Sequence, residues 1–484
     1  MALAAAPPTK GKPAAPRPAA PAATATVPSP TAAQPPKRIF PFPIEEHLLP
    51  NGLRVLLVKF DSPGLVGYYS LVRTGSRNEV EPGHTGFAHF FEHMMFRGTE
   101  KHPKEQYDEL LSQAGVSNNA FTTDDCTAFH AFGPTRALPL IIELEADRFQ
   151  NLKYPEDDFR TEAKAVLGEY NKNYSNPTEK MEEALLDTAF SVHPYKHTTM
   201  GFKADVEAMP SRYAYSLEFF KRWYRPDNTT LIVVGDFDAA STLQLIEKAY
   251  GSWSGRSATI AIPSEPPQTR KKAVNVSWAN PTQPRLVLAW HTPETRVSTP
   301  WAALQNVLGP YLFGPTSPLY NDLVLERQLV TSLSGTYWDH RDPNLFGVFA
   351  TLKSEESFGE VQKAIDATLA ELRAGKVDAK RLEDIKSNQK YGLLNSFDEI
   401  ESVGLALVFS ISPTGDPRAL DALFNHMDAL QPKDLVEFAK TRLIDTNSTA
   451  VTLVGAGAKP PPGIPEYTPQ PAPSTGDAKK GGAR

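Results

Sequence analysis

The sequence contains almost no cysteine. Its 484 residues include a single one, Cys126, which excludes an internal disulfide framework and a zinc site built on thiolates. Any metal ion would therefore have to be held by histidine and carboxylate side chains. Because a free cysteine commonly behaves as a small hydrophobic residue, we expect Cys126 to be buried or half-buried.

The sequence also lacks an apolar run long enough to span a bilayer and a block of charge of one sign. Acidic and basic residues are interspersed, and the formal net charge is -6. The charge therefore gives no reason to expect binding to nucleic acid or to an anionic membrane. With 40% hydrophobic and 22% charged residues, the composition is that of an ordinary soluble protein, and the length predicts two or more domains.

Both ends of the chain have a composition that cannot bury a core. Residues 1–38 are rich in alanine and proline and contain no acid, which predicts a disordered leader. Residues 458–484 are rich in proline and glycine, which predicts a disordered tail. The leader lacks the basic and apolar regions of an intact secretory signal. We interpret the chain as a bacterial protein that is periplasmic or secreted, with a cytoplasmic location as the alternative.

A short stretch recurs at an offset of 219 residues. "YSLEFFKRWYRPDNTTLIVVG" (215–235) and "DLVEFAKTRLIDTNSTAVTLVG" (434–455) both indicate an amphipathic helix, a polar turn and a β-branched strand. The identical pairs are Glu218/Glu437, Phe219/Phe438, Lys221/Lys440 and Asn228/Asn447. The repeat predicts two similar halves; the alternative is a chance match between two common helix–turn–strand units.

The predicted organisation follows from this repeat. We expect a first domain over 39–254, a linker over 255–272, where proline, serine and basic residues interrupt the periodic segments, and a second domain over 273–457. Short β-branched runs alternate with longer helical patterns in each half. The predicted fold class is α+β, with each half a largely antiparallel β-sheet that has helices packed on one face.

The segment "GFAHFFEHMMFRG" (86–98) combines a strongly apolar pattern with two histidines and a glutamate. Its spacing predicts a helix over 85–97 that Gly98 ends, with His89 and His93 one turn apart on the same face. The Phe and Met residues occupy the other faces, so the helix should be buried. Both imidazoles can then reach one metal ion.

Glu92 lies inside the same helix, where an unpaired buried carboxylate is costly. A metal ion and a metal-bound water beside Glu92 would give the carboxylate partners and remove that cost. Nitrogen ligands without sulfur favour one Zn²⁺ per chain, although Mn²⁺ or Co²⁺ would fit the same residues. The other interpretation is a pair of core histidines, hydrogen-bonded to the backbone, with Glu92 as their ion-pair partner.

A third ligand must come from another segment. The helical pattern "DDFRTEAKAVLGEYNKNY" supplies Glu162 and Glu169, which lie two turns apart on one face. One of these carboxylates could bind the metal while the other orients a histidine. The residues alone leave this possibility open beside a second one, that both are solvated surface acids.

With these residues the chain resembles the M16 metallopeptidases, the inverzincin group whose motif is H-x-x-E-H. Beyond the segment at 86–98, the resemblance rests on "VRTGSRNEVEPGHTGFAHFFEHMMFRGTE", "NNAFTTDDCTAFH", "HPYKHTTMG" and "YRPDNTTLIVVGDFD". It covers residues 40–253 almost completely. It implies the fold of the mitochondrial processing peptidase, with a zinc-bearing first half and a second half without zinc.

The resemblance assigns further residues. In the family the third zinc ligand lies 76 positions after the second histidine, which from His93 gives Glu169, and Glu162 matches the supporting acid seven residues earlier. Asn119 and Ala120 match a strand edge beside the zinc, where a substrate adds as an extra strand through main-chain hydrogen bonds.

The implied activity is zinc-dependent hydrolysis of peptides or unfolded polypeptides. The metal would activate a water molecule, and Glu92 would act as general base and pass the proton to the leaving amine. On this basis the catalytic residues are Glu92 and Glu162. The alternative from another class is a non-catalytic scaffold or a peptide-binding subunit of an M16-like complex.

The second half departs from the family pattern. Members with a complete site carry an Arg and, seven positions later, a Tyr that reach the substrate, on a segment that resembles L-R-E-x-x-G-L-A-Y-S. In "LVLERQLVTSLSG" (323–335) these positions hold Val324 and Thr331. Either other side chains replace the pair, or a homologous M16 subunit supplies it. We expect the second case, with this chain as the zinc-bearing subunit of a heteromer.

Overall fold

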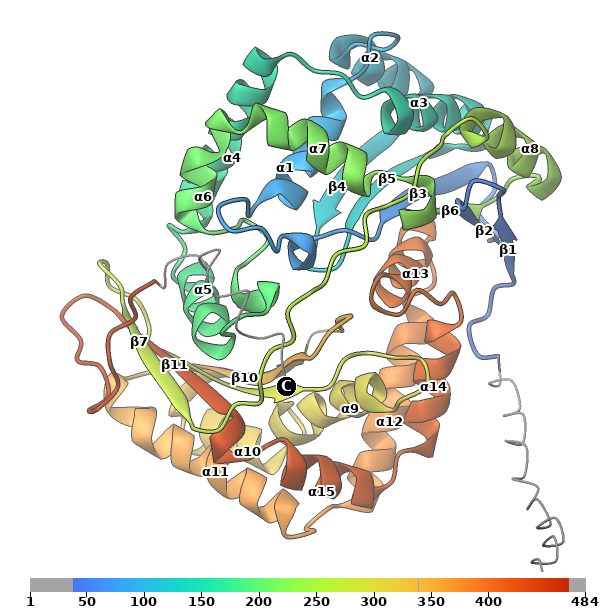
Figure 1. Ribbon diagram of the computed structural model, residues 1–484. Helices are drawn as coiled ribbons and strands as arrows, with labels where there is room; N and C mark the ends of the chain where they lie inside the picture. The colour runs from blue at the N-terminus through green and yellow to red at the C-terminus, as the bar shows by residue number, and fades with distance from the viewer. Residues whose placement is uncertain (1–37, 338, 470–484) are drawn as a thin grey trace, which may run out of the picture. The chain divides into compact units, whose positions relative to one another are not determined.

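The computed structural model describes residues 38–337 and 339–469, which form two β-sheets surrounded by helices (Figure 1). Both halves belong to one compact unit of the chain. The disorder predicted for residues 1–37 and 470–484 lies outside the described residues. No helix in the described part of the chain combines the length and the apolar character that a membrane span requires.

The first sheet has six strands among the described residues, in the order β1-β2-β6-β3-β5-β4. The strands are β1 Ile44–Leu48, β2 Arg54–Lys59, β3 Leu65–Val72, β4 Ser117–Thr122, β5 Thr127–Pro134 and β6 Thr229–Gly235. All neighbours are antiparallel except β2 and β6, which are parallel. Strand β4 lies at one edge.

The second sheet has five strands in the described residues, in the order β7-β11-β8-β10-β9. The strands are β7 Lys272–Ser277, β8 Arg285–Thr292, β9 Val330–Tyr337, β10 Asn344–Leu352 and β11 Ser448–Val454. Only β7 and β11 pair in parallel within these strands. The order matches that of the first sheet from β2 to β4, which confirms two largely antiparallel, homologous halves.

The predicted repeat occupies equivalent places in the two halves. Its helix is α7 (Tyr213–Trp223) in the first copy and α15 (Pro432–Thr441) in the second, and the strands that follow, β6 and β11, begin 219 residues apart. Before each strand an asparagine, Asn228 or Asn447, donates its side-chain amide to the carbonyl five residues earlier. The helix ends and the strand begins through the same contact in both copies.

Each sheet is covered on one face by helices of its own half. In the first half these include α1 Phe87–Met94, α2 Lys104–Ala114, α3 Leu138–Asn151, α4 Glu156–Asn173 and α8 Ala239–Tyr250, with α5 Pro177–Ala189 and α6 Lys203–Ala208 nearby. In the second half they include α9 Trp301–Phe313, α11 Phe358–Arg373 and α12 Ala379–Asn395, while α10 is Pro318–Tyr320, α13 Ile400–Thr414 and α14 Ala419–Ala429.

The opposite face of each sheet is covered by a helix from the other half. Helix α13 packs Leu407 and Val408 with Ile232 of the first sheet, and α5 packs Leu185 with Val451 of the second (Figure 1). Because both faces are covered, every residue of β6 and β11 is buried, and buried and exposed residues do not alternate along these strands. The sequence predicted helices on one face of each sheet. It did not predict that a helix of the other half covers the second face.

The segments between and after the halves follow the surface. Residues 255–271 contain no regular structure and connect α8 to β7, where the linker was expected (Figure 1). The sequence predicts disorder from residue 458, yet the Glu466 carboxylate accepts hydrogen bonds from Asn275 Nδ2 and the Ser277 amide (both 2.7 Å). Tyr467 donates to Asp187 (3.0 Å), so this part of the tail lies against β7 and α5.

Candidate metal centre

Helix α1 begins at a point fixed by backbone geometry and by a buried acid. Gly86 precedes the helix with φ 87°, a conformation that favours glycine. The Glu79 carboxylate accepts hydrogen bonds from the amides of Gly86 and Ala88 (both 2.7 Å), which would otherwise lack partners in the first turn. The helix continues as a 3₁₀ turn to Arg97, and Gly98 (φ 83°) follows. Its apolar side chains are buried, as the sequence predicts.

The structure brings His89, His93 and Glu169 together. Nε2 of His93 lies 3.3 Å from Glu169 Oε2, and Nε2 of His89 lies 3.8 Å from the same oxygen. One ligand atom from each residue falls within 4.8 Å of the other two, and this is the one such group that a search of the described residues finds. The two histidines come from α1 and the glutamate from α4, which packs beside it.

Glu162 lies behind the two histidines. It contacts His93 but does not belong to the triad formed by His89, His93 and Glu169. Its Oε1 is 2.9 Å from His93 Nδ1, and its Oε2 accepts a hydrogen bond from Arg97 Nε at 2.7 Å. The contact with Nδ1 leaves Nε2 of His93 directed toward Glu169. This is the geometry in which a carboxylate orients a metal-binding imidazole.

Burial and charge set the protonation of these groups. Burial, reinforced by the neighbouring His93, lowers the pKa of His89 to about 4, so this imidazole is neutral at pH 7. Burial also acts to lower the pKa of His93, but the contact with Glu162 outweighs it and the pKa is raised. For Glu162, the hydrogen bonds from His93 and Arg97 overcome the effect of burial and lower the pKa.

The residues present fit a zinc ion. Two imidazole nitrogens and one carboxylate oxygen form the ligand set of a catalytic zinc site, which keeps one further position open. The neutral form of His89 is the form that binds metal. Its Nε2 is the ring nitrogen that faces Glu169, and its Nδ1 is buried without a hydrogen-bond partner among the described residues.

Glu92 lies beside the triad without joining it. Thr122, the last residue of β4, donates its hydroxyl to Glu92 Oε2 at 2.7 Å. Burial raises the pKa of Glu92, although the hydrogen bond from Thr122 opposes this effect. A carboxyl group whose pKa lies above its ordinary value is suited to take up and release a proton near neutral pH.

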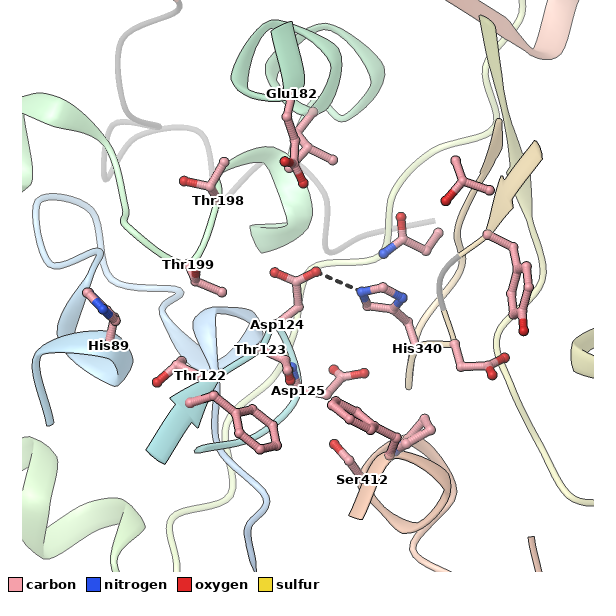
Figure 2. A pocket seen from close by; sticks show the side chains of 18 of the residues that line it. His89, Thr122, Thr123, Asp124, Asp125, Glu182, Thr198, Thr199, His340 and Ser412 are labelled. Carbon is pink, nitrogen blue, oxygen red and sulfur yellow. Dashed lines mark hydrogen bonds and ion pairs between the residues drawn. The ribbon is translucent and has the colours of Figure 1, made fainter. Parts of the chain in front are cut away.

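Both halves line a single cavity of about 960 Å³ next to the triad. Its wall in the first half includes His89, Glu92, Thr122, Asp124, Glu169 and Glu182. From the second half it includes Asn306, Tyr337, His340 and Phe409. Figure 2 shows His89 and Thr122 on one side of this cavity and His340 across it, with Asp124 between them.

Asn119 and Ala120 lie in β4, at the edge of the first sheet. Strand β4 pairs with β5, and its other side has no strand neighbour in the described part of the chain. Asn119 is exposed, and its Oδ1 accepts the hydrogen bond of the Ala120 amide (2.9 Å). The edge position is the one that strand addition requires.

The described residues of the second half contain no counterpart of the triad. Helix α9, which packs on the second sheet as α1 does on the first, contains no histidine or acidic residue. Val324 packs half-buried against the second core, and Thr331 is exposed and donates to the Thr351 carbonyl (3.3 Å). Neither residue lines the cavity.

The backbone supports the register that places Val324 and Thr331 at the Arg and Tyr positions. In that register the family's glycine falls on Gln328, which has φ 51° and is the non-glycine residue with positive φ in the described ranges. The nearby Arg327 is paired with Asp322 (Nε–Oδ1 2.9 Å) and does not line the cavity. No arginine of this segment replaces the missing one.

Sequence reasoning did not identify three residues that support the site. Arg97 follows His93 by one helical turn, and this spacing could have indicated its place beside Glu162. Thr122 and Glu79 lie inside the blocks that resemble the family, but no local pattern shows that one contacts Glu92 and the other caps α1. Cys126 is buried, as expected.

Comparison with known proteins agrees with the geometry. A family model described as "Insulinase (Peptidase family M16)" matches residues 68–203, and one described as "Peptidase M16 inactive domain" matches residues 213–389. "Zinc protease PqqE" of Helicobacter pylori is 27% identical over 425 residues, which cover 84% of this chain and 92% of that protein. "Uncharacterized zinc protease YmxG" of Bacillus subtilis is 23% identical and covers 86% and 100%.

Solved structures share the fold over most of the chain. The crystal structure of a protease from Helicobacter pylori superposes with a TM-score of 0.79 at 26% identity and covers 85% of this chain and 99% of that one. A peptidase M16 inactive domain from Pseudomonas fluorescens has a TM-score of 0.75 at 15% identity, with 88% and 100% covered, which bears on the fold alone. By its sequence and its two-half fold, the chain is a zinc metallopeptidase-like protein and belongs to the M16 family.

Proposed function

We propose that the protein is a zinc metalloendopeptidase that hydrolyses peptides or unfolded polypeptides. The observation that carries this proposal is the convergence of His89, His93 and Glu169 within 4.8 Å, beside a cavity that Glu92 also lines. The zinc-protease names of the relatives support the same chemistry. One zinc ion per chain would be held by His89 Nε2, His93 Nε2 and Glu169.

Each side chain of the site has a separate role in the proposed reaction. A zinc ion held by these residues would lower the pKa of a bound water to about 7 and would polarise a carbonyl group. Glu92 takes up the proton of the attacking water and passes it to the leaving amine. Glu162 keeps His93 in the tautomer and orientation that present Nε2 to the metal. The free edge of β4, at Asn119 and Ala120, binds the substrate backbone as an added strand.

The zinc-bearing chain works as one subunit of a heteromer. Val324 and Thr331 lie outside the cavity, and no arginine among its described lining residues replaces the family's pair. A homologous M16 subunit that lacks H-x-x-E-H would supply the Arg and the Tyr. The match of residues 213–389 to a family model described as an inactive domain is consistent with a second half that does not bind metal.

The replacement Glu92→Gln tests the mechanism. Glutamine keeps the size and the hydrogen bond from Thr122 but cannot take up the proton, so hydrolysis should fall by about 100-fold or more. Because Glu92 does not belong to the triad, the zinc content measured by atomic absorption should stay at one per chain. Hydrolysis of a fluorogenic peptide at an unchanged rate would refute the role of Glu92.

A non-catalytic scaffold is the second candidate, because the absent Arg and Tyr leave the site incomplete in this chain. It differs from the first in one measurable respect. A scaffold would bind peptide without turnover in every combination with a homologous subunit, and Glu92→Gln would change nothing.

A further inference from the structure

The proposed base is oriented by a hydroxyl from the first sheet. Thr122 Oγ1 donates to Glu92 Oε2 at 2.7 Å and is the hydrogen-bond donor to this carboxylate among the described residues. The contact joins the end of β4 to the middle of α1. A base that is fixed through one oxygen presents the other in a constant direction.

Thr122 is rigidly connected to the tip of the hairpin formed by β4 and β5. The amide of Thr123 donates to the Cys126 carbonyl (2.8 Å), and the Thr123 hydroxyl accepts from the amides of Cys126 (3.1 Å) and Asp125 (3.2 Å). These bonds close a tight turn directly after Thr122. The position of its hydroxyl therefore depends on where the turn is held.

Groups of both halves hold this turn. From the first half, the Ser76 hydroxyl donates to Asp124 Oδ1 and the Arg77 amide donates to the Asp124 carbonyl (both 2.9 Å).

The second half adds contacts of its own. In the 339–343 loop, which leads into β10, His340 Nε2 lies 2.7 Å from Asp124 Oδ2, and the Arg341 amide donates to Asp125 Oδ2 at 2.8 Å. Figure 2 shows Asp124 directed toward His340 across the cavity. The other oxygen of Asp125 accepts the Tyr195 hydroxyl (2.8 Å), so first-half and second-half groups meet on one carboxylate.

The loop itself is anchored to the first half at a second carboxylate. Asp342 Oδ2 lies 2.5 Å from Arg77 Nε and 3.0 Å from His193 Nε2, and Arg341 Nη1 donates to the Arg73 carbonyl (3.0 Å). Arg77, Asp125 and His193 come from three of the sequence blocks that resemble the family. None of the three touches the triad, and all of them converge on this loop.

A ring contact fixes β4 on its other flank. Phe121, next to Thr122, stacks on Phe409 of α13 with centroids 5.3 Å apart. Helix α13 belongs to the second half, so β4 is held by that half beside Thr122 as well as at the tip of its hairpin.

We infer that Thr122 is a positioning residue for Glu92 and that the 339–343 loop of the second half acts through the hairpin to keep it in place. This inference rests on the proposed function, since it concerns the proposed base. It gives the second half a part in the reaction that needs neither the Arg nor the Tyr of the family pattern.

The first test is a pair of replacements at Thr122. Thr122→Val keeps the shape and removes the hydroxyl, so kcat should fall by about tenfold while KM and zinc content stay unchanged. Thr122→Ser restores the donor and should recover kcat to within about threefold of the wild type. Thr441→Val, at the exposed end of α15, is the matched control and should leave kcat unchanged. A wild-type kcat for Thr122→Val, or equal losses for Val and Ser, would overturn the inference.

The second test concerns the loop. His340→Ala should lower kcat, His340→Gln, which keeps a donor, should lower it less, and His340→Ala should add nothing in a Thr122→Val background. Arg285→Ala removes another contact between the halves, with Thr178 of α5, and should leave kcat unchanged. Independent, multiplicative losses in the double variant would show that the loop does not act through Thr122.

A readout without turnover separates this inference from the proposed function. In the zinc-free chain, His340→Ala should speed amide exchange in the peptide covering 117–127, measured by mass spectrometry, and Arg285→Ala should not. Unchanged exchange overturns the role of the loop, whatever the activity. If the wild type fails to hydrolyse peptides in every combination while the exchange result holds, the proposed function fails and the control of the hairpin by the loop stands.

Discussion

Glu162 links the candidate metal ligands His89, His93 and Glu169 to the rest of the first half. Its two oxygens are occupied by different partners, His93 Nδ1 at 2.9 Å and the guanidinium of Arg97, so the carboxylate cannot turn without losing one of them. The ring of His93 is thereby fixed in one orientation. A metal that binds His93 must also displace the proton whose binding Glu162 favours, which makes this carboxylate part of the balance between proton and metal.

Glu162→Gln should weaken zinc binding by about 10–100-fold, because glutamine keeps the shape but not the charge that orients and polarises the imidazole. Competition with a chromophoric chelator measures the affinity. The control is Glu143→Gln, at a surface acid paired with Lys101, which should leave the affinity unchanged. Equal affinities for the wild type and Glu162→Gln would show that this carboxylate does not support the site.

At the scale of elements, the packing of α13 on the first sheet depends on close approach of the helix to the sheet at one point. Where α13 crosses β3, a Cβ added to Gly404 would lie 2.0 Å from the ring of Tyr69. That ring is fully buried, and its hydroxyl donates to the Glu401 carbonyl at 3.0 Å, so it has no free direction in which to move. The glycine sets the distance between the helix of the second half and the sheet of the first.

Gly404→Ala should therefore reduce the free energy of unfolding by about 1–3 kcal/mol through overpacking. Gly392→Ala in α12 is the control, because no atom lies within 4 Å of its added Cβ and alanine favours a helix by about 0.5–1 kcal/mol. Urea denaturation followed by circular dichroism gives both values. A stabilised Gly404→Ala variant would mean that α13 does not cross β3 at this distance.

Local sequence patterns predicted the parts of the fold that depend on neighbouring residues. The spacing of His89 and His93 indicated the helix of the site, and the repeat around Asn228 and Asn447 indicated two halves. The cover of the second face was not predictable, since an apolar pattern shows that a face is buried but not by what. The same limit applies to Asp124 and His340, whose contact joins residues 216 positions apart.

The candidate site also contains residues that the sequence could predict and residues that it could not. The resemblance predicted that Glu162 and Glu169 lie beside the histidines, and the structure has both residues there. The prediction was possible because helical periodicity and family spacing agree for these two residues. Thr122 was missed, since its hydroxyl reaches Glu92 only through the packing of a sheet edge on a helix. The departure at Val324 and Thr331 was visible in the sequence, and the positive φ of Gln328 supports the register on which it depends.

At the scale of the whole molecule, the two halves contribute unequal parts to one cavity. The first half supplies all three residues of the triad and the proposed base. The second contributes residues such as His340, Tyr337 and Phe409 of α13, but no arginine, to the lining that the structure describes. Under the proposed function, a chain built in this way would bind zinc by itself and would lack groups that act on the substrate.

The chain alone should therefore bind one zinc ion and hydrolyse peptides poorly. A homologous subunit that carries the Arg and Tyr but lacks H-x-x-E-H should raise the rate by about 100-fold or more, the usual effect of donors that stabilise developing charge. Peptide hydrolysis by each chain and by their mixture, with size-exclusion chromatography of the mixture, measures this. Replacing the partner's Arg, or using Glu92→Gln in this chain, should remove the gain. Full activity of the chain alone would refute the requirement for a second subunit, because the groups that act on the substrate would then have to come from its own cavity.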